Sequence, residues 1–274
     1  MEPQTKFALI GASAVLGLAL VNRYANGGVN RHSPKQTGKV IVITGANTGL
    51  GYIAAEELAR LGPAKLVLAC RDKARGQAAV DQIKAATKSD CAEFMQLDLN
   101  DLQSVKDFSA SFRSKYNKLD TLMMNAGVMT IPERELTKQG HEKQFGVNHI
   151  GHFLLAKLLL DRVKESEEGR IVVLSSLAHA GGNKSIRFDD MTHEKSYSPF
   201  DAYYMSKLSN VFFTKVLAKQ LEDDNVKNVK VVSLHPGVVR TELGRYFFTG
   251  WKKALMLPFQ PLMFLMTKPA WYGA

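Results

Sequence analysis

The alternation of apolar segments along the chain limits the fold more than any other feature of the sequence. Residues 40–44 form a continuous run dominated by β-branched apolar side chains, which is typical of a strand buried on both faces. Residues 50–61 follow with apolar side chains at helical spacing. The same pattern recurs and predicts strands at 40–44, 65–70, 94–99, 119–124, 171–175 and 229–234. Strands separated by helices imply a parallel, doubly wound α/β sheet in three layers with right-handed crossovers.

The helices between these strands are predicted at 50–61, 73–86, 101–116, 141–163 and 199–221, and Asn100 is expected to cap the third of them. With 274 residues, 45% of them hydrophobic, the chain can build a full core, and its length fits one large α/β domain or two small ones. The two cysteines, Cys70 and Cys91, give no disulfide framework.

A glycine-rich turn joins the first strand to the first helix. It is written Thr44-Gly-Ala-Asn-Thr-Gly-Leu-Gly51. Glycines in such a turn let the backbone approach a pyrophosphate closely, and the helix N-terminus offers free N–H groups and the positive end of the helix dipole. Because the turn follows a strand and opens a helix, it predicts a dinucleotide site on a Rossmann-type sheet.

Further motifs follow in a fixed order. They are Asn125-Ala-Gly127 after the fourth strand, Asn148 in the next helix, Ser175-Ser176 at the end of the fifth strand, Tyr203-Tyr-Met-Ser-Lys207, and Pro236-Gly237 after the sixth strand. With the T-G-x-x-x-G-x-G spacing of the glycine turn, this series resembles the short-chain dehydrogenase/reductase family over about residues 38–245. The resemblance implies an NAD(P)-dependent oxidoreductase acting on a CH–OH/C=O pair.

Helical geometry explains the Y-x-x-x-K pair. Tyr203 and Lys207 are four residues apart, so their side chains share one helix face about 5–6 Å apart. An ammonium beside a phenol favours the phenolate, so the pKa of Tyr203 is expected to fall from about 10 toward the working pH. The phenol can then exchange a proton with a carbonyl or alcohol oxygen. Tyr204 lies equally near Lys207, and the family pattern selects Tyr203, leaving Tyr204 as packing or a pocket wall.

The resemblance implies a catalytic set of Asn148, Ser176, Tyr203 and Lys207. Ser176 would donate a hydrogen bond to the substrate oxygen, with Ser175 in a structural role, and Asn148 would hold a water that relays protons to Lys207. The nucleotide-binding residues that it implies are Gly45, Asn47, Thr48, Gly49, Leu50, Gly51, Arg71, Asp98, Leu99, Asn125, Ala126, Gly127, Tyr203, Lys207, Pro236, Gly237, Val238 and Thr241. Among these, Asp98 and Leu99 resemble the contact to the adenine edge, and Thr241 the contact to the nicotinamide carboxamide.

The end of the second strand bears on the choice of cofactor. An acidic residue at that point suits the ribose 2′-hydroxyl of NAD, and a basic one suits the 2′-phosphate of NADP. The sequence there reads Ala69-Cys-Arg71-Asp72. Arg71 can stack on adenine and pair with phosphate, whereas Asp72 stands one position later. The sequence therefore favours NADP(H) over NAD(H).

Four features resemble the retinol dehydrogenase-like branch of the family, the first of them Leu66-Val-Leu-Ala-Cys-Arg71. Ser176 and Tyr203 are separated by 27 positions, so residues 180–202 look like an insertion. Asn148-His-Ile-Gly-His-Phe153 and Tyr204-Met-Ser-Lys-Leu-Ser-Asn210 are further similarities. The resemblance implies a lipophilic substrate, a retinal-, sterol- or aldehyde-like carbonyl and its alcohol.

Residues 7–21 form an uncharged apolar run before a polar stretch at 22–38. At about 22 Å the run is short for a bilayer core, so a cleaved signal peptide and a buried core helix compete with an uncleaved membrane anchor. Arg23 and Tyr24 stand where a cleavage site should be, which favours the anchor. We therefore predict an N-terminal anchor and basic linker at 1–38, a dehydrogenase domain at 39–274, and location at the endoplasmic reticulum or a mitochondrial membrane.

The formal net charge is +10, and the segment 1–40 carries five Lys/Arg against one acid. No basic cluster is interleaved with aromatic residues, so the charge does not indicate nucleic-acid binding. The apolar, Met-rich stretch at 251–266 is interpreted as a substrate lid, a surface that dips into lipid, or a packed helix–turn–helix. Because the chain stops at Ala274, where relatives usually continue, the C-terminal part of the domain is expected to be truncated.

Two other hypotheses concern function. The anchor, the basic arm and the abrupt C-terminus also suit a non-catalytic nucleotide-binding accessory subunit of a membrane complex, and a homo-oligomer is compatible with the sequence as well. His149 and His152, three residues apart on a helix, suggest a metal site, but no third ligand is evident and the expected chemistry needs none.

Overall fold

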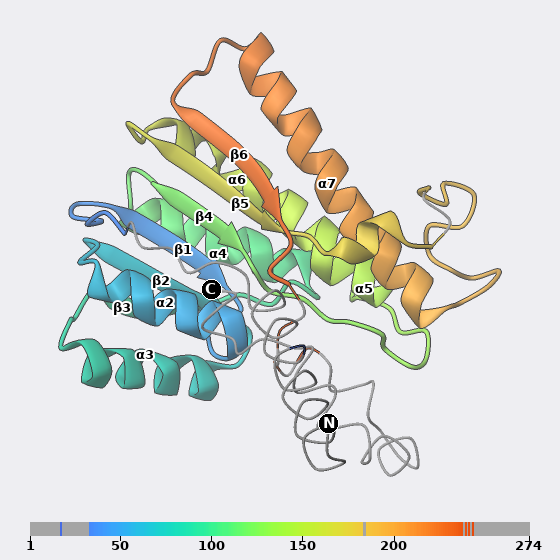
Figure 1. The fold of residues 1–274 in the computed structure, drawn as a ribbon, viewed down its shortest axis with the longest axis horizontal. Helices are drawn as coiled ribbons and strands as arrows, with labels where there is room; N and C mark the ends of the chain where they lie inside the picture. Colours follow the sequence, from blue (N-terminus) through green and yellow to red (C-terminus); the bar gives the residue numbers. More distant parts are fainter. Residues whose placement is uncertain are drawn as a thin grey trace, which may run out of the picture.

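The computed structural model describes residues 17, 33–182, 185–237, 239, 241 and 243. Its centre is a six-stranded parallel sheet in the order β3-β2-β1-β4-β5-β6 (Figure 1). The strands are β1 (Val40–Thr44), β2 (Lys65–Cys70), β3 (Ala92–Gln96), β4 (Thr121–Met124), β5 (Gly169–Leu174) and β6 (Val229–Leu234). The order reverses between β1 and β4, which is the switch point where doubly wound sheets bind ligands. The predicted Rossmann-type, doubly wound parallel sheet is confirmed.

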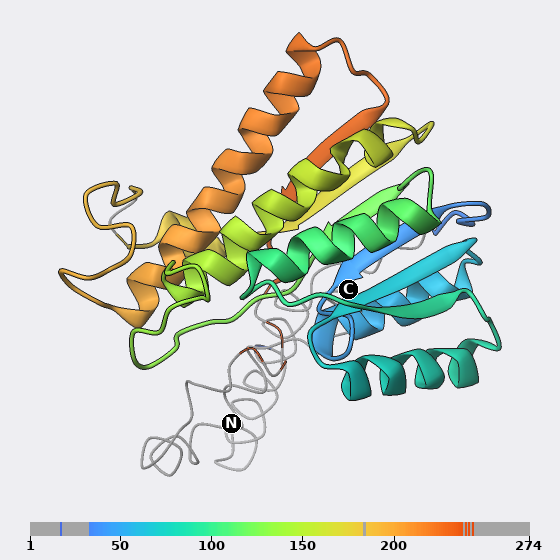
Figure 2. The ribbon, with the colours of Figure 1, turned by 180° about the vertical axis from the view of Figure 1, so that it is seen from behind.

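Helices cover both faces of the sheet. On one face lie α2 (Gly49–Arg60) and α3 (Lys73–Thr87), and on the other lie α4 (Leu102–Lys115), α6 (Gly151–Lys164) and α7 (Pro199–Asp223) (Figures 1 and 2). The short elements are α5 (Lys143–Phe145), the π-helical turn η1 (Gly146–Ile150) and the 3-10 turn η2 (Leu177–Ala180). In Figure 1 the arrowheads of the strands point to one side of the sheet, so the loops that follow the strands gather there.

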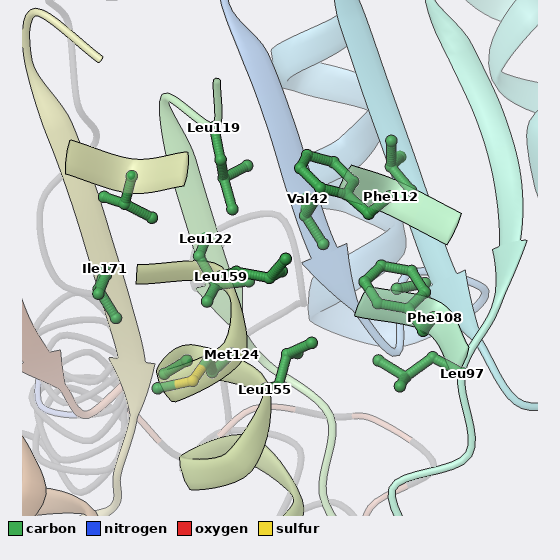
Figure 3. Close-up of a cluster of buried hydrophobic side chains, with 14 of the residues drawn as sticks. Val42, Leu97, Phe108, Phe112, Leu119, Leu122, Met124, Leu155, Leu159 and Ile171 are labelled. Atoms are coloured by element: carbon green, nitrogen blue, oxygen red, sulfur yellow. The ribbon is translucent and has the colours of Figure 1, made fainter. Parts of the chain in front are cut away.

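The alternation of side chains along β1 divides the core into two clusters. Val40 and Val42 face the cluster with α4, α6 and α7, whereas Ile41 and Ile43 face the cluster with α2 and α3. Figure 3 shows the first cluster, in which aromatic rings of α4 and leucines of α6 pack against the sheet. A strand buried on both faces needs apolar side chains at every position, which explains the unbroken run of residues 40–44.

The structure corrects the expected helix at 141–163. The chain forms α5, then the π-turn η1, and only then α6. The carbonyl of Asn148 accepts hydrogen bonds from the side chains of His152 and Asn210. The contact from His152 comes from one turn further along the same segment, whereas the contact from Asn210 is a tertiary one from α7. A π-turn inside a helix is often found at a functional site.

Smaller corrections concern element ends. Asp101, rather than Asn100, caps α4, because its carboxylate accepts from the backbone N–H of Gln103. The third strand is β3 at Ala92–Gln96, so Asp98 and Leu99 lie in the loop beyond it. The segment interpreted as an insertion, 180–202, consists of turns and irregular chain where it is described, up to the start of α7.

Several predictions concern residues outside this description. The predicted anchor at 7–21 falls there except for Gly17, and so does the stretch at 251–266. Within the part of the chain that the structure describes, no helix has both the length and the apolar character needed to span a membrane.

Candidate active site

The glycine turn between β1 and α2 adopts a backbone that only glycine accepts readily. Gly45 and Gly49 have φ of +67° and +57°. A Cβ at Gly45 would lie 3.0 Å from Cα of Ala126, and a Cβ at Gly51 would lie 2.5 Å from the carbonyl oxygen of Gly45. The three glycines therefore bring the turn, the start of α2 and the loop after β4 into close contact.

The N-terminus of α2 has the features of an anion site. Thr48 is its N-cap residue but makes no side-chain cap hydrogen bond, and the first turn contains no acidic residue. The first N–H groups of a helix have no partner within the helix, and the helix dipole places partial positive charge there. The residues thus fit the pyrophosphate of a dinucleotide, with Asn47 and Leu50 in the same turn.

Hydrogen bonds join the end of β4 to the same turn. The hydroxyl oxygen of Thr44 accepts from the backbone N–H groups of Asn125 and Ala126, each at 3.0 Å. The Asn125 amide donates in return to the carbonyl of Thr44 at 2.9 Å. A Cβ at Gly127 would lie 3.2 Å from Oδ1 of Asn148, so this loop also approaches the π-turn. The sequence predicts that Asn125, Ala126 and Gly127 bind the nucleotide. The structure adds Thr44, whose hydrogen bonds hold Asn125 and Ala126 against the glycine turn.

Arg71 and Asp72 follow β2 and have different surroundings. The Asp72 carboxylate caps α3 by accepting from the backbone N–H of Arg75 at 2.9 Å. Arg71 is exposed at the carboxyl edge of the sheet. The capping bond gives Asp72 a structural task at the start of α3.

The structure places the remaining predicted nucleotide residues in two loops. After β3, Asp98 accepts a hydrogen bond from the backbone N–H of Asn100 at 2.9 Å, and Leu99 is buried against Gly151 of α6. After β6, Pro236 and Gly237 continue the chain, and Thr241 returns to the glycine turn, where its methyl group would lie 3.2 Å from a Cβ at Gly49. Val238 lies outside the described residues.

The Y-x-x-x-K pair lies on the buried face of α7. Tyr203 and Lys207 are 5% and 4% exposed, and the Lys207 ammonium lies 5.6 Å from the centre of the Tyr203 ring. Lys207 Nζ donates to the carbonyl of Leu174, the last residue of β5, at 3.0 Å. Burial lowers the pKa of Lys207 to about 8, so the ammonium loses its proton more easily than a surface lysine.

Tyr203 departs from the expected electrostatics. Burial raises the pKa of its phenol, and a hydrogen bond with Ser176 lowers it by less. The expected net fall toward the working pH is therefore wrong for the chain alone, because desolvation of the phenolate outweighs the stabilising contacts. The phenol is protonated at neutral pH and is a proton donor in this state.

The two serines after β5 have different hydrogen-bond partners. Ser175 Oγ donates to the carbonyl of Lys207 at 2.8 Å and so ties the end of β5 to α7. Ser176 is only half-buried, begins the turn η2, and accepts from the backbone N–H of Ala178 at 3.2 Å. Its hydroxyl lies beside the Tyr203 phenol, where a substrate oxygen can contact both groups.

Asn148 is buried and its side chain is fully used. Its amide oxygen accepts from the N–H of Val128 at 2.8 Å, and its amide nitrogen donates to the carbonyl of Val128 and to Ser206 Oγ at 2.9 and 3.0 Å. These bonds fix the loop after Gly127 against α7. A water relay at Asn148 therefore stays a prediction, and it would have to share groups that already have partners.

His152, considered with His149 as a metal ligand, instead joins two parts of the site. It is 2% exposed, with Nδ1 at 3.1 Å from the carbonyl of Asn148 and Nε2 at 2.8 Å from Thr44 Oγ1. A carbonyl only accepts, so Nδ1 carries the proton and Nε2 accepts from Thr44. In the described part of the chain, no group of three potential ligands could hold a metal ion.

Burial lowers the pKa of His152 to about 4, which predicts an acid-sensitive fold. Between pH 6.5 and 4 the unfolded chain binds the proton and the folded chain does not, so the free energy of unfolding falls as the pH falls. At pH 5 we expect this residue to cost about 2 kcal/mol of stability relative to pH 7. Melting temperatures at both pH values should differ less in His152→Gln than in wild type.

The control for this prediction is His141→Gln, which changes a histidine in the loop before α5. It should keep the wild-type pH dependence. Equal pH dependence in His152→Gln and wild type would show that the acid sensitivity comes from other groups.

A pocket lies between α7 and the segment before it. Its lining includes His179, Arg187, Asp201, Tyr204, Met205 and Leu208. Tyr204 is thus a pocket wall, one of the two roles expected for it. The pocket adjoins the helix turn that carries Tyr203, so the segment interpreted as an insertion helps to shape the surroundings of the site.

The fold and this site define a dinucleotide-binding oxidoreductase, with a phosphate-binding turn at the switch point of a doubly wound sheet and a Ser–Tyr–Lys set at the same edge. The family model described as short chain dehydrogenase matches residues 39–250. The chain belongs to the short chain dehydrogenase family, and it is an oxidoreductase acting on the CH–OH/C=O pair.

Individual relatives agree. The chain is 45% identical to mouse retinol dehydrogenase 12 over 225 residues, 82% of this chain and 69% of the relative. It is 42% identical to human retinol dehydrogenase 13 over 245 residues, 89% and 71% of the two chains. Among solved structures, a short chain dehydrogenase/reductase from Burkholderia phymatum in complex with NAD superimposes with a TM-score of 0.62 at 26% identity, covering 78% of this chain and 70% of that one.

Proposed function

We propose that this protein is an NADP(H)-dependent oxidoreductase that interconverts a lipophilic carbonyl, retinal-, sterol- or aldehyde-like, and its alcohol at a membrane. The observation that carries the proposal is the set formed by half-buried Ser176 with buried Tyr203 and Lys207, at the sheet edge that holds the glycine turn. A membrane location rests on the apolar run at 7–21 alone, and the comparisons give no support to a mitochondrial membrane.

The side chains divide the chemistry between them. Ser176 donates a hydrogen bond to the substrate oxygen, and the Tyr203 phenol supplies the proton that this oxygen needs in reduction or accepts it in oxidation. The nicotinamide, when bound, supplies or accepts the hydride. The Lys207 ammonium stabilises the phenolate left by proton transfer, a state that burial alone makes costly. Asn148 keeps the loop after β4 against α7.

The surroundings of Arg71 support NADP(H). Arg71 is exposed directly after β2, at the carboxyl edge of the sheet, and the neighbouring carboxylate of Asp72 is engaged in capping α3. A guanidinium can make two parallel hydrogen bonds to a phosphate, which a ribose hydroxyl cannot offer. The Burkholderia phymatum neighbour is a complex with NAD, so the alternative has to be tested directly.

Removal of the Arg71 side chain tests the cofactor preference. Because charged hydrogen bonds contribute about 1.5–3 kcal/mol, Arg71→Ala should raise KM for NADPH by about 10–100-fold. KM for NADH should change by less than about threefold, since NADH has no 2′-phosphate to lose. The control is Arg170→Ala, which removes a guanidinium on β5 that pairs with Glu168. This variant should leave both KM values unchanged. Equal effects on both cofactors would contradict a contact with the 2′-phosphate.

Two observations support a lipophilic substrate: the names of the relatives and the lining of the pocket beside α7. The relatives are named retinol dehydrogenases, and the pocket beside α7 combines apolar walls such as Met205 and Leu208 with polar groups. The alternative, a non-catalytic accessory subunit, finds no support in relatives that are all named dehydrogenases. Its specific expectation is bound but unreactive NADPH in a stable large assembly.

Turnover of purified full-length protein decides between the two. NADPH absorbance should fall when retinal or a long-chain aldehyde is added, and small polar carbonyls should react more slowly. Tight NADPH binding without turnover of any carbonyl or alcohol in the panel would contradict the enzymatic proposal and favour the accessory subunit.

A further inference from the structure

Asn210 lies in the catalytic region without a role in the proposed chemistry. It follows Tyr203 by seven residues and Lys207 by three, so all three side chains share one face of α7. Asn210 is 2% exposed. A buried amide is costly unless its hydrogen bonds are satisfied, so its partners indicate what it holds.

The Asn210 amide nitrogen joins two backbone carbonyls from different elements. It donates to the carbonyl of Leu174 at the end of β5, at 3.1 Å, and to that of Asn148 in the π-turn, at 3.2 Å. The Leu174 carbonyl is also the acceptor for Lys207 Nζ, at 3.0 Å. Asn210 therefore holds the oxygen against which the catalytic ammonium is placed.

His149 determines how the Asn210 amide is oriented. Its Nδ1 lies 3.1 Å from Asn210 Oδ1. Because the amide nitrogen faces two carbonyls, the amide oxygen must face His149, which accordingly donates from Nδ1. Burial lowers the pKa of His149, so the ring is neutral at working pH. The rings of Phe145, Phe153 and Phe213 pack around it.

We propose that Asn210 is a positioning residue that fixes the Leu174 carbonyl beneath the Lys207 ammonium, and that His149 sets the orientation of the Asn210 amide. The role in turnover rests on the proposed function. In this proposal the hydrogen bonds of His149 in η1 and of Asn210 in α7 serve to position Lys207, and His149 is not a metal ligand.

The placement matters because Lys207 has little other support. Among the described residues, the Leu174 carbonyl is the one hydrogen-bond acceptor of its ammonium, and no carboxylate lies beside it. A hydrogen bond to a charged form favours that form. A carbonyl free to move would therefore weaken both the position and the charge of Lys207.

Asn210→Leu removes the amide with little change in volume, and His149→Phe keeps the aromatic packing while removing the orienting hydrogen bond. We expect kcat for carbonyl reduction to fall about tenfold in the first and about threefold in the second, with KM for NADPH within about twofold of wild type. Ser209→Ala is the matched control, since Ser209 is equally buried on α7 but donates within its helix to Met205. It should retain wild-type kcat.

A double-mutant cycle separates positioning from general damage. If Asn210 acts through Lys207, Asn210→Leu should cost little further activity in a Lys207→Arg background, because the effects of coupled residues are not additive. The same tenfold loss in both backgrounds would overturn the proposal. If Asn210→Leu does not fold, the same double-mutant cycle is measured with His149→Phe and Lys207→Arg.

The side-chain nitrogen of Lys207, followed by NMR in the free protein, provides a readout independent of turnover. Its titration, centred near pH 8 in wild type, should move to lower pH in Asn210→Leu and His149→Phe but not in Ser209→Ala. An unmoved titration in both variants would overturn the proposal. If wild type reduces no carbonyl, the proposed function fails, and this titration still decides whether Asn210 holds Lys207.

Discussion

Replacement of Tyr203 by phenylalanine is expected to lower kcat for carbonyl reduction by about 10³-fold, because the substrate oxygen loses its proton donor. The phenol is 5% exposed and its ring packs in α7 beside Lys207, so the fold should tolerate the change. The loss should appear in kcat and kcat/KM alike, since proton donation contributes only in the transition state. Steady-state kinetics with NADPH and retinal measure it.

Tyr116→Phe is the matched control for this substitution. Tyr116 follows α4, and its hydroxyl donates to Glu93 at 2.7 Å, away from the sheet edge that carries the site. This variant should retain wild-type kcat. Wild-type activity in Tyr203→Phe would remove the basis of the proposed mechanism, because within the described part of the chain no second phenol has the same relation to Ser176 and Lys207.

Gly51→Ala is expected to weaken NADPH binding by at least about tenfold and to lower the free energy of unfolding by about 2 kcal/mol. The added Cβ would lie 2.5 Å from the carbonyl oxygen of Gly45 and 2.4 Å from the amide nitrogen of Asn125. The backbone oxygen cannot move without opening the glycine turn, so the N–H groups that would face a pyrophosphate shift with it. Nucleotide fluorescence measures the affinity, and thermal melting measures the stability.

Gly62→Ala separates these two effects. Gly62 has φ of +69° with nothing within 4 Å of an added Cβ, so alanine there strains the backbone but touches no part of the site. We expect a loss of about 1 kcal/mol in stability with unchanged NADPH affinity. Wild-type affinity in Gly51→Ala would show that the close approach of α2 to the turn is not needed for the nucleotide.

The pattern of apolar runs in the sequence was sufficient to predict the parallel sheet. The predicted strands at 40–44, 65–70 and 229–234 agree with β1, β2 and β6 at both ends. For β1 and β2 the reason is that strands buried on both faces admit few polar residues, whereas β6 is a partly exposed edge strand. Agreement failed where tertiary contacts overrode helical spacing. The helix expected at 141–163 contains a π-turn, and within that turn the carbonyl of Asn148 accepts a hydrogen bond from Asn210 of α7.

The motifs also gave the order of the candidate site residues along the chain. They did not predict the pKa shifts of those residues. The spacing of Tyr203 and Lys207 put both on one helix face and suggested a lowered phenol pKa. In the folded chain, burial raises the pKa of Tyr203 and lowers that of Lys207. The spacing of residues in the sequence shows which side chains are neighbours on a helix. Desolvation of a side chain depends on the strands and turns that bury it, which the spacing does not show.

By itself, the sequence determined the doubly wound sheet, the glycine turn and the identity of the Ser176, Tyr203 and Lys207 set, because each depends on local spacing and on the carboxyl edge that parallel strands share. Only the tertiary structure decided that His149 and His152 are hydrogen-bond partners of Asn210 and Thr44. Those roles depend on which side chains distant segments bring within hydrogen-bond distance. A polar side chain has the same appearance in a sequence whether it meets a metal, a solvent molecule or a carbonyl.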